Sequence, residues 1–247
     1  MRILAIDSSG LVATVAVVEE EETAGAKTIA EYTVNYKKTH SQTLLPMLDE
    51  IMKMTEMELE SMDAIAVSGG PGSFTGLRIG SATAKGLGLA LDKPLIHIPT
   101  VDALAYNLCY TDKLVCPIMD ARRNQVYAGI YELEGEILHI LEPQMAVGIE
   151  ELAEKLRTYG REVIFLGDGV PVHRERLCKE LMTGQKISFA PAHMNHQRAA
   201  AVGALACQYY REGRMETAAE HKPDYLRVSQ AERERAERLK QEGEGRL

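Results

Sequence analysis

The sequence predicts an α/β protein of two lobes built on a duplicated unit. Its first half is predicted to contain three strands, a helix, a strand and a helix, and its second half repeats this order. With 247 residues and 45% hydrophobic content, the chain can bury one large core or two modest ones. A cleft between two such lobes is where we expect a ligand to bind.

Alternating apolar residues predict the elements of the first half. An acidic loop at residues 19–25 is expected to be solvated, and Thr39 and Gln42 have the spacing of a capping box before the first helix. The first-half strands are expected at 2–7, 13–18, 28–36, 64–68 and 94–98, and the helices at 41–54 and about 74–91.

The second half follows the same pattern and sets the domain boundaries. Strands are expected at 114–119, 125–133, 136–141, 163–166 and 187–189, and helices at 150–159, 172–182 and 197–210. We assign 1–103 to the first lobe, joined by the helix at about 197–212, and 104–196 to a smaller second lobe. Residues 213–247 are expected to form an extended, charged tail. The end of this tail is expected to be a solvated helix or disordered, and the alternative is that it is a partner-binding arm.

One strand–turn–helix stretch, residues 64–91, stands out because of its glycines. Ser73 or Thr75 can cap the helix, which contains Gly76, Gly80, Ala84 and Gly88 at four-residue spacing on one face. Each helical glycine costs roughly 1 kcal/mol relative to alanine. Two interpretations explain this cost: the helix packs closely on its own sheet, or the smooth face receives something from outside.

Composition excludes several classes of function. The net charge of −8 disfavours direct binding of nucleic acid, and four scattered cysteines without a CxxC pair argue against a zinc site or a disulfide framework. Without a signal peptide or a membrane span, the chain is expected to be cytoplasmic. No GxSxG motif is present, so a peptidase function lacks the residues that it needs.

Four motifs together carry a family resemblance. The chain reads ILAIDSS at Ile3–Ser9, HSQTLLPML at His40–Leu48, GPGSFTGLRIG at Gly70–Gly80 and MDARRNQVYAGIY at Met119–Tyr131, with PDYLR at Pro223–Arg227 as a weaker agreement. It resembles the bacterial TsaB (YeaZ) family of tRNA threonylcarbamoyladenosine biosynthesis proteins, within the actin, Hsp70 and sugar-kinase (ASKHA) superfamily. The resemblance implies a two-lobed actin-like fold of duplicated ribonuclease-H-like βββαβα units.

The resemblance also implies a role without catalysis. In this family the transfer of threonylcarbamoyl to the tRNA adenosine next to the anticodon is carried by a paralogue, TsaD, which TsaB binds and activates, and a TsaE-type ATPase joins them. The two metal-binding histidines of the paralogue fall on Thr100 and Leu104 of this chain. We therefore expect no catalytic residue, no metal, no required cofactor, and contact with tRNA only through the complex.

The superfamily suggests a vestigial nucleotide site. We assign it to Asp7, Ser8, Ser9, Gly167, Asp168 and Gly169. Weak ATP or ADP binding is compatible with these residues, but Asp7 could equally end a strand and hold a turn through local hydrogen bonds. Bulky side chains at residues 120–124 stand where a glycine-rich phosphate loop is expected. An ATP-dependent small-molecule kinase or ATPase is the alternative function.

The partner interface is expected on the two helices of the first lobe, with a homodimer through the same face as a competing state. We expect Leu77→Glu or Gly80→Leu to abolish association and leave the monomer folded. The interface residues are His40, Leu44, Leu45, Leu48, Met52, Phe74, Leu77, Ile79, Gly80, Ala84, Leu87 and Gly88.

Overall fold

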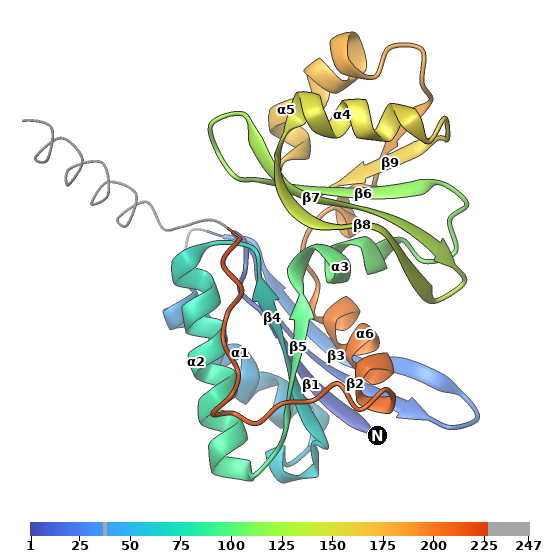
Figure 1. The fold of residues 1–247 in the computed structure, drawn as a ribbon. Helices are drawn as coiled ribbons and strands as arrows, with labels where there is room; N and C mark the ends of the chain where they lie inside the picture. The colour runs from blue at the N-terminus through green and yellow to red at the C-terminus, as the bar shows by residue number, and fades with distance from the viewer. Residues whose placement is uncertain (37–38, 227–247) are drawn as a thin grey trace, which may run out of the picture.

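The computed structural model describes residues 1–36 and 39–226, which form two lobes with a five-stranded sheet each (Figure 1). The strand orders are β3-β2-β1-β4-β5 and β10-β9-β6-β7-β8. In each sheet the first strand of its half pairs antiparallel with the second and parallel with the fourth. This equivalence confirms the predicted two-lobed, duplicated α/β fold.

The first part of the chain, within described residues 1–36 and 39–99, contains the five strands of the first sheet and two helices. These are β1 (Arg2–Asp7), β2 (Ala13–Glu21), β3 (Gly25–Val34), α1 (His40–Thr55), β4 (Ala64–Gly70), α2 (Phe74–Leu91) and β5 (Leu95–Pro99). Described residues 100–226 contain α3 (Thr100–Ala105), β6 (Leu114–Asp120), β7 (Gln125–Glu134), β8 (Ile137–Gly148), α4 (Ile149–Thr158), β9 (Val163–Leu166), α5 (Val170–Arg176), β10 (Ile187–Phe189) and α6 (Ala199–Arg211).

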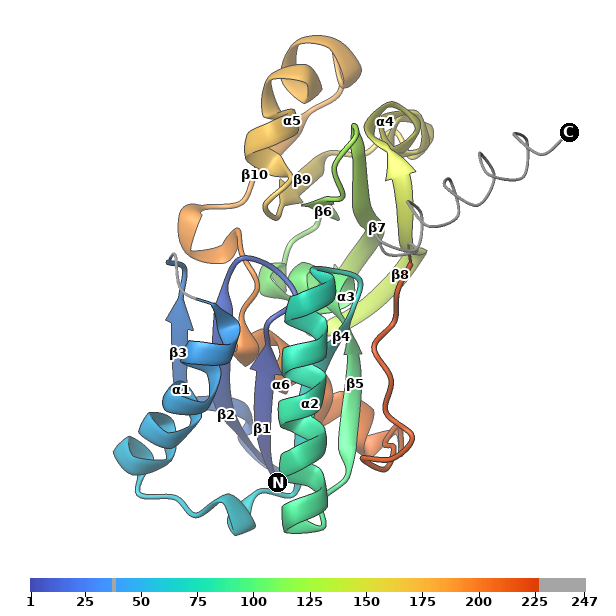
Figure 2. The same ribbon diagram turned by 90° about the vertical axis from the view of Figure 1, so that its left-hand side faces the viewer.

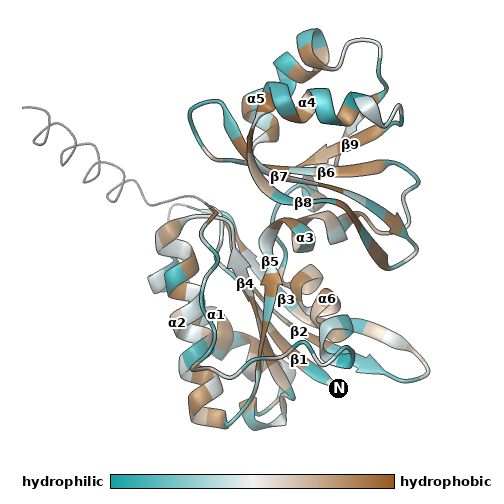
Figure 3. Ribbon diagram, in the orientation of Figure 1, coloured by the Kyte–Doolittle hydropathy of each residue, from teal (hydrophilic) through white to brown (hydrophobic). Residues whose placement is uncertain are grey.

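Alternation along β1 explains the layers of the first lobe. Ile3 and Ala5 point to a core shared with α6, whereas Leu4 and Ile6 point to a core shared with α1. The apolar colouring of the strands in Figure 3 follows from this burial on both faces. Helix α6 therefore packs on the first sheet although it follows the second sheet in the chain. The lobe boundaries, 1–103 and 104–196, stay a prediction.

Helix α3, which periodicity did not predict, lies between the two sheets (Figure 1). Its Asp102 accepts a hydrogen bond of 2.7 Å from the hydroxyl of Tyr131 on β7, and both side chains are buried. Burial raises the pKa of Asp102. This buried contact ties the segment after the first sheet to the second sheet.

Several local predictions were wrong, including the strand expected at 136–141, which runs from Ile137 to Gly148 as β8. Residues 19–21 continue β2 because the Glu19 carboxylate pairs with Arg2 at 2.7 Å and with Lys27 at 3.1 Å, so only residues 22–24 form the turn. Thr39 is the N-cap of α1 but makes no side-chain cap hydrogen bond, because its hydroxyl bonds that of Ser41 instead. The expected helix at 172–182 begins at Val170 as α5 and ends in a π-helical turn, Leu177–Leu181.

The segment after α6 runs back along the first lobe, beside β5 and then along α2 (Figures 1 and 2). Glu216 and Leu95 exchange two backbone hydrogen bonds of 2.9 Å, and the amide of Asp224 donates to the carbonyl of Gly69 at 2.6 Å. Residues 213–226, which we call the C-terminal strap, are thus fixed to the lobe and include a turn at 217–220, and the extended tail expected at 213–247 stays a prediction. The charged end predicted for 227–247 lies outside the described residues.

None of the helices in the described ranges combines the length and the apolar character that a membrane span requires.

Candidate functional site: the interlobe cleft and the α1–α2 face

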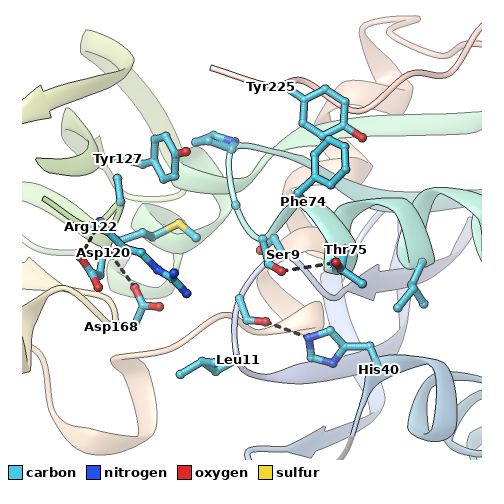
Figure 4. A pocket seen from close by; sticks show the side chains of 18 of the residues that line it. Ser9, Leu11, His40, Phe74, Thr75, Asp120, Arg122, Tyr127, Asp168 and Tyr225 are labelled. Atoms are coloured by element: carbon cyan, nitrogen blue, oxygen red, sulfur yellow. Dashed lines mark hydrogen bonds between the residues drawn. The ribbon is translucent and has the colours of Figure 1, made fainter. Parts of the chain in front are cut away.

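A cleft of about 1130 Å³ opens between the two lobes, at the position that the sequence predicts (Figure 4). Its first-lobe wall consists of the turn after β1 and the starts of α1 and α2. Its second-lobe wall consists of the β6–β7 turn and the turn after β9. The end of the strap contributes Asp224, Tyr225 and Leu226.

Asp7, predicted to be a nucleotide ligand, is buried beneath the cleft. One carboxylate oxygen accepts hydrogen bonds from the amide and the hydroxyl of Ser9, at 2.8 and 2.6 Å, and the other accepts from the hydroxyl of Ser68 at 2.6 Å. Burial raises its pKa despite these bonds. Both oxygens are engaged within the chain, so the geometry matches the structural alternative: Asp7 ends β1 and holds the turn. Unless this turn rearranges, Asp7 cannot contact a ligand in the cleft.

The next residue, Ser8, explains the glycines of α2. Its hydroxyl donates to the carbonyl of Gly76 at 2.9 Å. A Cβ atom at Gly76 would lie 2.0 Å from the Ser8 carbonyl oxygen, and one at Gly80 would lie 2.4 Å from the Ser8 hydroxyl. The turn after β1 therefore occupies the smooth face of α2, which is capped by Ser73. Close packing on its own lobe, the first of our two interpretations, is what the structure shows.

The turn after β9, Gly167–Asp168–Gly169, packs against the end of β6. A Cβ atom at Gly167, whose φ is +106°, would lie 2.2 Å from the carbonyl oxygen of Ile118. Asp168 faces the cleft and accepts from the amide of Asp120 at 3.1 Å, and burial raises its pKa. These glycines thus allow the turn to approach the backbone at the end of β6. The second-lobe wall of the cleft therefore presents the carboxylates of Asp120 and Asp168 rather than free backbone amides.

The β6–β7 turn adopts the left-handed backbone conformation that glycine adopts most easily. Arg122, Arg123 and Asn124 all have φ between +55° and +62°, which is uncommon for residues with side chains. The amide of Arg122 donates to the Asp120 carboxylate at 2.8 Å, and the Arg122 side chain lies at the cleft (Figure 4). The turn thus presents side chains rather than a glycine backbone to the cleft, and its correspondence to a phosphate loop stays a prediction.

Two aromatic side chains form a wall that sequence reasoning did not bring together. The rings of Phe74, at the start of α2, and Tyr225, in the strap, have centroids 5.0 Å apart (Figure 4). The Arg78 guanidinium lies 3.8 Å from the Phe74 centroid and donates to the Tyr225 hydroxyl at 3.4 Å. The only signal in the sequence was the PDYLR motif, which by itself gives no location.

His40, assigned to the partner interface, lies at the cleft instead. Its Nε2 is 2.8 Å from the carbonyl oxygen of Gly10, and its Nδ1 is buried without a hydrogen-bond partner among the described residues. Phe74 likewise lines the cleft. These two residues of the predicted interface therefore belong to the wall of the cleft.

Most of the remaining interface prediction needs correction, because those side chains are in the core. Leu77 and Ala84 are buried on α2, and a Cβ atom at Gly88 would lie 2.4 Å from the Leu95 side chain. Leu44 is also fully buried; Leu48 and Met52 are buried except for edges that line a shallow groove. The apolar residues are shared with the first sheet's core, so Leu77→Glu and Gly80→Leu would disrupt the monomer.

A smaller apolar face remains exposed on the outer side of α1 and α2, and we call it the α1–α2 face. It comprises Leu45 and the partly exposed Leu87, together with a groove of about 470 Å³ lined by Leu45, Leu48, Asp49, Met52, Leu87 and residues 57–60. Leu45 is 59% exposed. Gly86 opens onto this side: among the described residues, no atom outside its own helix lies within 4 Å of the place that a Cβ atom would take.

Two five-stranded sheets of equivalent topology around an interlobe cleft define a two-lobed actin-like fold. The inorganic polyphosphate/ATP-glucomannokinase from Arthrobacter sp. strain KM shares this fold. It superposes with a TM-score of 0.50 at 11% identity, over 85% of this chain and 99% of that one.

Sequence similarity then gives the family. The family model of TsaD, tRNA N6-adenosine threonylcarbamoyltransferase, matches residues 27–235. The tRNA threonylcarbamoyladenosine biosynthesis protein TsaB of Bacillus subtilis is 34% identical over 94% of this chain and 96% of its own length. YeaZ from Pseudomonas aeruginosa superposes with a TM-score of 0.76 at 26% identity, over 91% of this chain and 99% of that one. The chain belongs to the TsaB (YeaZ) family, whose curated members are named as tRNA threonylcarbamoyladenosine biosynthesis proteins.

Proposed function

We propose that this protein is a non-catalytic partner that binds and activates a TsaD-type threonylcarbamoyltransferase in the modification of tRNA. The observation that supports this most directly is at the positions that correspond to the paralogue's metal-binding histidines. The Thr100 hydroxyl is buried and accepts a hydrogen bond from the Gly70 amide at 3.2 Å, and Leu104 is in the core. Neither residue is available as a metal ligand.

The α1–α2 face is the proposed docking surface, and its occupant is the corresponding helix pair of the TsaD-type paralogue. The transferase model matches residues 27–235, a range that includes both helices, so the paralogue carries counterparts of α1 and α2. Two related helix pairs can meet about a pseudo-two-fold axis and pack as a bundle. A homodimer through the same face is the competing state, and contact with a TsaE-type ATPase and with tRNA would follow through the complex.

The alternative function, an ATP-dependent kinase or ATPase, is favoured by the size of the cleft. Against it, Asp7 is engaged within the chain and Asp168 faces the cleft near Asp120, where like charge would repel a triphosphate. We propose that ATP or ADP binds weakly and that no nucleotide is required. Calorimetric titration with ATP and magnesium, with a phosphate-release assay, would favour the alternative if turnover were fast.

Co-elution of the purified chain with the TsaD-type protein of the same organism tests the docking proposal. Leu45→Glu places a charge at the centre of the proposed surface and should cost about 2 kcal/mol or more, roughly a 30-fold loss of affinity. Ile137→Glu is the matched control, because Ile137 is 58% exposed on β8 of the other lobe. Both variants should stay folded. Undiminished co-elution of Leu45→Glu would refute this interface, and transfer activity by the isolated chain would refute the non-catalytic role.

A further inference from the structure

Two histidines and a glutamate, far apart in the sequence, meet where the strap crosses β5. His97 comes from β5, and Glu216 and His221 come from the strap. One donor atom from each residue lies within 4.8 Å of the others. Two imidazole nitrogens and a carboxylate oxygen are a donor set that zinc binds, with a fourth position left open for water.

His221 is the residue whose environment most requires explanation. Its ring is buried, its Nδ1 lies 2.6 Å from a Glu216 carboxylate oxygen, and its Nε2 has no hydrogen-bond partner in the described part of the chain. A buried polar nitrogen without a partner costs about 1–3 kcal/mol.

His97 is placed to complete the site. Its ring lies against the backbone of Gly69, where a Cβ atom would be 2.0 Å from the ring Cε1, so a side chain at position 69 would displace it. The His97 and His221 rings have centroids 5.6 Å apart.

We propose that His97, Glu216 and His221 bind one zinc ion, which holds the strap to β5. This site uses none of the positions that correspond to the paralogue's metal ligands, and it does not depend on the proposed function. The same strap carries Asp224 and Tyr225 to the interlobe cleft. Zinc binding therefore fixes one wall of the cleft from outside it.

The first test measures zinc binding by the full, tag-free chain, after removal of metal with a chelator, by calorimetry and by metal analysis. Cys178 is an exposed thiol, so all proteins carry Cys178→Ser. The expected result is one zinc per chain. His97→Gln and His221→Gln should each weaken binding by about 100-fold or more, because even the loss of an indirect partner of a metal ligand costs 10–100-fold. His139→Gln, which removes an exposed imidazole paired with Glu134, should bind like the parent.

Proteolysis of the strap is a second test, which does not require the two histidine variants to be equally stable. Trypsin can cleave after Arg214, which lies within the strap. Zinc should slow this cleavage in the parent and in His139→Gln but not in His97→Gln, whose substitution lies outside the strap. Absence of zinc binding by the parent would overturn the site, and so would equal zinc affinity and equal protection in His97→Gln and His139→Gln.

Discussion

Replacing Gly76 by alanine tests whether the smooth face of α2 is internal. The new methyl group would lie 2.0 Å from the Ser8 carbonyl oxygen, whereas real Cβ contacts stay beyond 3.0 Å, so the backbone must separate by about 1 Å. Both sides resist this movement. The Ser8 hydroxyl bonds the Gly76 carbonyl, and the amide of Ser73 donates to the Ser9 carbonyl at 2.7 Å.

Two opposing effects set the size of the change. Alanine gains about 1 kcal/mol over glycine in a helix, and forced overpacking in a tight contact costs typically 1–3 kcal/mol. Because a main-chain oxygen is the obstacle, we take the upper end and expect a net loss of about 2 kcal/mol. Gly86→Ala is the matched control on the same helix, with open space around its Cβ position, and should gain about 0.5–1 kcal/mol.

Equilibrium unfolding in urea and thermal melting measure both variants. For a chain of this length, 1 kcal/mol corresponds to a shift in Tm of about 2–4 °C, so Gly76→Ala should melt about 4–8 °C lower and Gly86→Ala about 1–4 °C higher. If Gly76→Ala proved as stable as Gly86→Ala, the helix would not be packed against the turn after β1. The glycine face would then be free for an external partner.

Three further predictions follow from buried and paired ionisable groups. Burial raises the pKa of Asp7 above its ordinary value of 3.8, so the folded chain holds this proton more tightly than the unfolded chain. The wild-type free energy of unfolding should therefore fall as the pH rises from 3.8 through the raised pKa. Asp7→Asn should flatten this pH dependence in urea titrations, and an unchanged slope would contradict the prediction. Tyr131→Phe removes the donor to buried Asp102 and should cost about 1–3 kcal/mol in urea unfolding, and a neutral effect would show that the pair does not hold the lobes. Arg176→Met should raise the pKa of Glu150 from about 2 toward 4.5 in an NMR titration, because Arg176 is the main cause of the shift; a value remaining near 2 would assign the shift to its other hydrogen bonds.

Periodicity was enough for the architecture and for most element positions. The strands at Val163–Leu166 and Ile187–Phe189 agree with the prediction at both ends, because short apolar runs between turns fix both boundaries. Likewise, the end of α2 at Leu91 could be read from local residues, and Ser73 is one of the two caps that these residues allowed. Local chemistry decides such features, and the sequence contains all of it.

Which face of a helix is internal depended on the whole fold. Four-residue spacing placed Gly76 and Gly80 on one side of α2, but it could not say that the Ser8 turn, nearly seventy positions earlier, would fill that side. For the same reason the cluster of His97, Glu216 and His221 has no sequence signature, since only the return of the strap across β5 brings its members together. Spacing along a chain records neighbours within one element, whereas contacts between distant elements exist only after the chain has folded.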